Sequence, residues 1–238
     1  MVLQKTLKVF TLFLPKHFKR LSITTFVFIA FATHAQEIVK EFKKDSLKTY
    51  PVSSSLKTIP AAYQEVIHTA LTYYPELDNT KIKFRIKKQA SPLTARPTIF
   101  SVFQKASKRK YIITISDKTN SKFSSIILKN LSFNSQIGVL GHELGHISFY
   151  GKKRGLYFLK LTLMHLSKKS IDTFEYTTDM ICIEHGLGYQ LLSWSKEVRL
   201  KLNLIHWKGI KQLEENGRER YMNPTSITKE ISENKVYN

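Results

Sequence analysis

The chain has 238 residues, enough for one domain with a hydrophobic core or for two small domains. Its 42% hydrophobic and 24% charged residues are typical of a globular protein and exclude a mostly disordered chain, a coiled coil, a collagen and a polytopic membrane protein. The single cysteine excludes a disulfide framework within the chain, and 38 Lys and Arg against 18 Asp and Glu give a basic protein of formal net charge +20.

The first 35 residues have the pattern of a secretory signal peptide. Five Lys and Arg side chains and no acidic one precede an apolar run of 12 residues, Leu21 to Ala32, and small residues follow at positions 33 and 35. The run is shorter than the ~20 residues that span a bilayer. We therefore expect residues 1–35 to direct export to the periplasm or the medium, with an uncleaved membrane anchor as the alternative.

The rest of the chain is predicted to form one domain, residues 60–215, between a polar lead-in (36–59) and a polar C-terminal tail (216–238). Pro60 can begin a helix whose apolar residues recur at helical spacing as far as Tyr74. Alternating or β-branched patterns then predict three strands, within residues 81–87, 98–104 and 111–116.

Helical patterns dominate the second half of the chain. Ser132 or Asn134 can cap a helix that includes residues 137–147. Further helices are predicted at residues 156–166, 171–185, 190–202 and 205–215. Strands followed by helices indicate the α+β class.

One motif in these helices carries chemistry: residues 142–146 read His-Glu-Leu-Gly-His. Positions i and i+4 of a helix lie on one face, so His142 and His146 can present two imidazole nitrogens to one zinc ion. Glu143 lies beside them, where its carboxylate can take a proton from a water molecule as a general base. The alternative is a buried helix whose histidines hydrogen-bond to backbone carbonyls.

A catalytic zinc site needs a third protein ligand. A histidine six residues after His146 is excluded because Lys152 stands there. Glu175 and Asp179 instead share one face of the later predicted helix. We expect Glu175 to be the third ligand and Asp179 to accept the N–H of His142, which fixes the tautomer of that ligand. The alternative is that both acids form a solvated face.

These residues resemble the gluzincin zinc metallopeptidases, and within them the CAAX-prenyl-protease/heat-shock-protease type and its small soluble bacterial relatives. The second motif of that family reads E-x-x-A-D-x-x-A, and here Thr178 and Cys182 stand at the alanine positions. The resemblance implies Zn²⁺, peptide hydrolysis and a zincin-like fold, with a small, mostly antiparallel sheet and an edge strand beside the active-site helix. Binding of the substrate as an added strand would then use the residues of that edge, Tyr111, Ile112, Ile113, Thr114 and Ile115.

A metallopeptidase also needs a donor for the oxyanion. The candidates are His185, Tyr176, Tyr150 and Arg154, and His185 is our first choice.

The expected partner is a peptide or protein substrate. The basic residues are dispersed and no nucleic-acid-binding motif accompanies them, so nucleic acid is not expected. A peripheral contact with an anionic envelope surface is a further candidate. Two other functions remain open: a non-catalytic metal- or anion-binding envelope protein on the same scaffold, and a basic adhesion module in which the motif is accidental.

Overall fold

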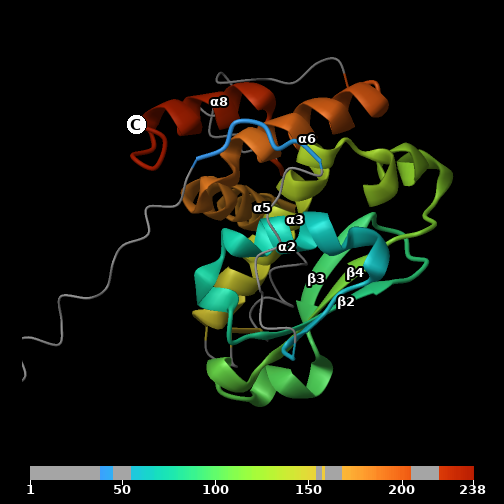
Figure 1. Cartoon of the computed structure of the whole chain (residues 1–238), viewed down its shortest axis with the longest axis vertical. Helices are drawn as coiled ribbons and strands as arrows, with labels where there is room; N and C mark the ends of the chain where they lie inside the picture. Colours follow the sequence, from blue (N-terminus) through green and yellow to red (C-terminus); the bar gives the residue numbers. More distant parts are fainter. Residues whose placement is uncertain (1–37, 45–54, 154–156, 159–167, 205–219) are drawn as a thin grey trace, which may run out of the picture. The chain divides into compact units, whose positions relative to one another are not determined.

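The computed structural model describes residues 38–44, 55–153, 157–158, 168–204 and 220–238 (Figure 1). The predicted signal peptide, residues 1–35, lies outside this part of the chain. So do the predicted helix at 205–215 and, apart from residues 157 and 158, the predicted helix at 156–166. No helix within the described residues is long and apolar enough to cross a bilayer.

The sheet has four strands in the order β1-β2-β4-β3. They are β1 (Lys57–Thr58), β2 (Lys81–Ile86), β3 (Leu93–Pro97) and β4 (Lys110–Ile115). β1 runs parallel to β2 and β2 parallel to β4, while β3 is antiparallel to β4. The prediction of a mostly antiparallel sheet is therefore wrong. The helix α2 (Gln64–Thr72) lies in the crossover between β1 and β2, and such a crossover allows parallel pairing.

The strand predicted to be the edge is a central strand. Residues 111–115 pair with β2 on one side and with β3 on the other. Tyr111, Ile113 and Ile115 are buried, and the nearly continuous apolar run of β4 is typical of an interior strand. The edge strand beside the helices is β3, which the sequence patterns did not predict. The strand predicted at 98–104 is instead the 3₁₀ helix η3 (Ile99–Phe103).

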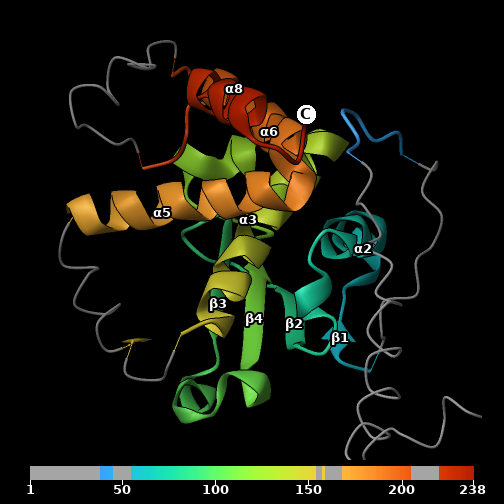
Figure 2. The ribbon, with the colours of Figure 1, turned by 90° about the vertical axis from the view of Figure 1, so that its left-hand side faces the viewer.

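The long helix α3 (Phe133–Gly151) lies at the centre of the helical layer. It packs against α2, α5 (Lys168–Cys182) and α6 (Gly188–Lys201), and against β3. Figure 2 shows that α5 crosses α3 and that the strands lie side by side. Ser132 caps α3 by accepting from the Ser135 N–H, and α5 passes into α6 through a π-helical turn, η7 (Ile183–Leu187).

Both segments predicted to lie outside the domain contribute to the fold. In the lead-in, Phe42 is buried and its backbone N–H donates to Asn134 Oδ1 at 2.9 Å. In the predicted tail, residues Pro224–Glu233 form the helix α8, which packs against α6. Glu37–Asn238 form one unit in the contact pattern.

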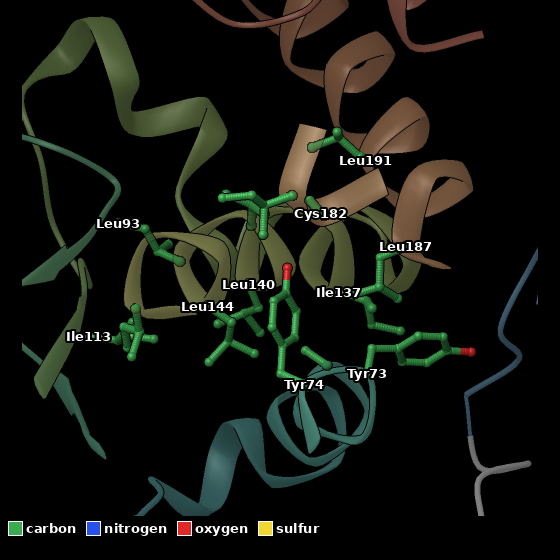
Figure 3. Packing of buried hydrophobic residues seen from close by; sticks show 14 of the residues in the cluster. Tyr73, Tyr74, Leu93, Ile113, Ile137, Leu140, Leu144, Cys182, Leu187 and Leu191 are labelled. Carbon is green, nitrogen blue, oxygen red and sulfur yellow. The ribbon is translucent and has the colours of Figure 1, made fainter. Parts of the chain in front are cut away.

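Buried side chains of α2 meet α3 in the core. Figure 3 shows Tyr74, just after α2, between that helix and α3, together with Leu140 and Leu144. The Tyr74 hydroxyl donates to the Gly141 carbonyl at 2.7 Å, so the middle of α3 is fixed in place next to the residues of the motif.

Candidate metal centre

Three ligand-type side chains meet where α3 and α5 cross. His142 and His146 lie one turn apart on α3, and Glu175 comes from α5. The Glu175 Oε2 atom lies 3.1 Å from His142 Nε2 and 3.2 Å from His146 Nε2. The ligand atoms of all three lie within 4.8 Å of one another, so this group could hold a metal ion. Both histidines are buried, as the apolar pattern of α3 requires.

Hydrogen bonds from α5 orient the two imidazoles. Asp179 Oδ1 lies 2.7 Å from His142 Nδ1, and Thr178 Oγ1 lies 3.1 Å from His146 Nδ1. The Thr178 hydroxyl donates its proton to the Phe174 carbonyl, so it accepts from His146 Nδ1. Both rings then carry the Nδ1 proton when neutral and direct the Nε2 lone pair toward Glu175.

This convergence of lone pairs on a carboxylate oxygen fits a bound cation. Burial by itself lowers the pKa of His142, but hydrogen bonds to Asp179 and Glu175 outweigh it and raise the pKa well above its ordinary value. Burial raises the pKa of Glu175, and hydrogen bonds to the two histidines more than reverse this. The imidazole nitrogen and the carboxylate oxygen need a positive charge between them. A proton on His142 can supply that charge, and so can a divalent metal ion. Two imidazoles and one carboxylate are a ligand set that zinc accepts.

Glu143 lies next to the triad without belonging to it. Its Oε2 atom is buried and has no hydrogen-bond partner among the described residues. Burial raises the pKa of Glu143, and the nearby His146 and His142 oppose that shift. The backbone of Ala95 on β3 lowers the pKa of the same carboxyl, so Glu143 lies near the edge strand. A buried carboxylate with one unpartnered oxygen can accept a proton from a water molecule.

A cavity of about 530 Å³ opens onto His142 and Glu143. Its walls come from the loop before β3, the 3₁₀ helix η5 (Ser121–Ile126), α6 and the segment before α8. Most of its wall residues are apolar, and they include Leu93, Phe123, Ile126, Leu131, Trp194, Val198 and Leu202. The cavity can accept an apolar group close to the candidate metal centre.

The C-terminal segment also contributes to this site. The sequence analysis did not predict that contribution. The Met222 N–H donates to Asp179 Oδ2 at 2.7 Å, so Asp179 connects His142 to the chain that precedes α8. The ring of Tyr221 packs on His142 with centroids 5.6 Å apart. Tyr221 is 36% exposed, but its partial burial, Glu175 and Glu143 raise the pKa of its hydroxyl, which therefore stays protonated and can donate a hydrogen bond.

His185 makes its contacts elsewhere. Its Nδ1 lies 2.7 Å from the Ile181 carbonyl, its Nε2 lies 3.0 Å from Glu76 Oε1, and its ring stacks on Tyr74. Both ring nitrogens are thus occupied, and the prediction that His185 stabilises an oxyanion is not supported. Of the other candidates, Tyr176 and Tyr150 are buried and Arg154 lies outside the described residues.

Comparison of the chain with protein-family models, with curated proteins and with solved structures finds no match. The candidate site is therefore defined by its own geometry.

Proposed function

We propose that this chain is an exported zinc-dependent peptidase. One observation carries the proposal: the Nε2 atoms of His142 and His146 converge on Glu175, beside a buried Glu143 carboxylate that has one unpartnered oxygen. A structural metal site needs its ligands but has no use for the additional carboxylate of Glu143. A metal held by these ligands would supply Lewis acidity that activates a water molecule and polarises a carbonyl group.

The residues of the chain then have distinct roles in hydrolysis. Glu143 accepts a proton from the attacking water and later delivers it to the leaving amine. Asp179 and Thr178 hold the ligand histidines in the tautomer that exposes Nε2. Tyr221, whose ring lies against His142, donates a hydrogen bond from its hydroxyl to the oxygen of the substrate carbonyl as negative charge develops there.

The substrate strand binds at β3 rather than at β4. The Thr98 N–H donates to the Lys110 carbonyl and the Ser116 N–H to the Pro92 carbonyl, so even-numbered residues of β3 hydrogen-bond to β4. The odd-numbered residues Leu93 and Ala95 therefore direct their backbone groups to the open edge. Because the Ala95 backbone lowers the pKa of Glu143 and so lies near it, a peptide added at this edge would pass the candidate base.

The test is cleavage of a mixed peptide library by the zinc-loaded chain beside Glu143→Gln. We expect the wild type to cleave, and the variant to bind zinc with the same stoichiometry but to lose cleavage. Zinc binding without cleavage in either protein would refute the peptidase and favour a non-catalytic metal-binding protein. Absence of stoichiometric zinc in both would refute the metal assignment.

The role of Tyr221 has its own test. Tyr221→Phe removes one donor and keeps the ring against His142. We expect kcat to fall by about 10²-fold while KM and zinc stoichiometry stay unchanged. An unchanged kcat would remove Tyr221 from the mechanism without affecting the assignment of Glu143.

The first 35 residues support the export part of the proposal. Fractionation of cells that produce the full chain, with N-terminal sequencing of the product, tests it. We expect a mature protein that begins at Gln36 outside the cytoplasm. An intact product in the cytoplasm would refute export.

A further inference from the structure

The connection between β3 and β4 carries an unusual set of exposed apolar side chains. We call residues 99–110 the β3–β4 tip; it comprises η3, a second 3₁₀ helix η4 (Ala106–Lys108) and the first residue of β4. Ile99 is 70% exposed, Phe100 86% and Phe103 80%. Phe100 and Phe103 are the most exposed large apolar residues of the described chain. In Figures 1 and 2 the tip lies at the opposite end of the ribbon from α6 and α8.

Hydrogen bonds hold these side chains outward. Ser101, between the exposed residues, is buried, and its hydroxyl lies 3.0 Å from the Lys110 carbonyl and 2.8 Å from the Thr98 hydroxyl. Arg109 is buried as well and donates to the Tyr150 and Lys153 carbonyls at the end of α3. The tip is thus fixed to α3, and the exposure of the phenyl rings is a property of a folded turn.

The surroundings of the tip are strongly basic. Residues 79–116 include ten Lys and Arg and no Asp or Glu. At the tip itself Lys105, Lys108 and Lys110 are exposed, and the exposed Lys81 pairs with Lys110 across β2 and β4. Apolar side chains beside lysines, with no acid among them, are complementary to a surface that offers both hydrocarbon and negative charge.

We propose that the β3–β4 tip binds the surface of an anionic phospholipid bilayer. Ile99, Phe100 and Phe103 enter the boundary between headgroups and acyl chains, and the lysines of the tip contact lipid phosphates. Phenyl rings exposed on a turn can enter a fluid interface, whereas a protein partner would need a matching pocket. Three apolar side chains and a few lysines give reversible binding. The proposal goes beyond the peptidase function and holds whether or not the chain cleaves peptides.

The first experiment is co-sedimentation of the full chain with vesicles. One set contains phosphatidylglycerol and phosphatidylethanolamine, and the other contains phosphatidylcholine alone. We expect binding to the anionic set that weakens with added salt. Phe100→Ser with Phe103→Ser should lower the partition coefficient at least about tenfold. The matched control is Leu200→Ser, because Leu200 on α6 is 78% exposed but lies outside the tip; its binding should equal that of the wild type.

The second experiment measures contact of the tip itself with the bilayer. Binding by any other segment of the chain therefore does not affect the result. An environment-sensitive fluorophore is attached to Phe103→Cys or, as the control, to Leu200→Cys; the native Cys182 is fully buried and does not label. We expect anionic vesicles to raise the emission of the first protein and leave the second unchanged. No change at position 103, or equal change at both positions, would refute the proposal. Concentration-dependent self-association that the double serine variant abolishes would also refute it, because a second copy would then cover the tip.

Discussion

The close packing of α3 against α6 can be tested by adding a methyl group at Gly138, where the structure leaves no space for it. A Cβ at Gly138 would lie 2.2 Å from the Gln190 carbonyl oxygen, 2.5 Å from its carbon and 2.8 Å from the Leu191 nitrogen. All three are backbone atoms of α6, so no side chain can rotate away. Ordinary van der Waals contact begins at 3.4 Å, so α3 and α6 would have to separate by about 1 Å.

The expected cost of Gly138→Ala is at the upper end of the range for overpacking, about 3 kcal/mol of unfolding free energy. For a chain of this size that corresponds to a fall in Tm of about 6–12 °C. Gly151→Ala is the matched control on the same helix, because nothing lies within 4 Å of its added Cβ. We expect it to leave stability unchanged or raise it by up to about 1 kcal/mol.

Denaturant unfolding followed by far-UV circular dichroism measures both variants. Equal midpoints for Gly138→Ala and Gly151→Ala would refute the close approach of α3 and α6. A lower unfolding midpoint for both variants would show that loss of glycine flexibility, rather than contact with α6, controls the stability of α3.

Two further predictions concern buried polar contacts. Asp179→Asn puts an NH₂ group opposite either His142 Nδ1 or the Met222 N–H, so we expect zinc affinity, measured by chelator competition, to fall about 10- to 100-fold; unchanged affinity would contradict the orienting role of Asp179. Burial raises the pKa of Glu76, but hydrogen bonds to His185 and Ser148 lower it to about 2, while Glu76 raises the pKa of His185 against the opposing effect of burial. The ion pair therefore contributes to stability at pH values above the unfolded pKa of Glu76 and below the unfolded pKa of His185. This contribution is lost as the pH rises and His185 deprotonates. A double-mutant cycle with Glu76→Gln and His185→Gln should give a larger coupling energy at about pH 5.5 than at about pH 9. Equal coupling at the two pH values would contradict it.

The ligand set was predictable because it depends on local spacing. His142 and His146 share a helix face at any tertiary arrangement, and so do Glu175 and Asp179. The structure brings the two faces together where α3 and α5 cross. Thr178 was not predictable as an orienting residue, since a threonine at a position expected to hold alanine indicates only a small side chain.

The sheet was harder to predict because strand order depends on residues distant in sequence. The strand β3 reads Leu-Thr-Ala-Arg-Pro, a weak strand pattern in which proline is tolerated only at an edge. The apolar residues of η3 have the sequence pattern of a strand, although Phe100 and Phe103 face solvent. The nearly continuous apolar run in β4 was evidence for a central strand, and the family resemblance led to the opposite assignment.

The C-terminal segment shows how a polar sequence can complete a site. Asn223 accepts from the Ser226 N–H and Pro224 occupies the first helical position, which is a start signal for α8 that the sequence contained. That helix fixes the residues before it, so that Met222 reaches one oxygen of Asp179 while His142 occupies the other. Because one carboxylate serves both, the position of the C-terminal segment and the orientation of a metal ligand are coupled. The described part of the polar C-terminal segment, residues 220–238, is therefore held by hydrogen bonds and helix capping beside the candidate metal centre.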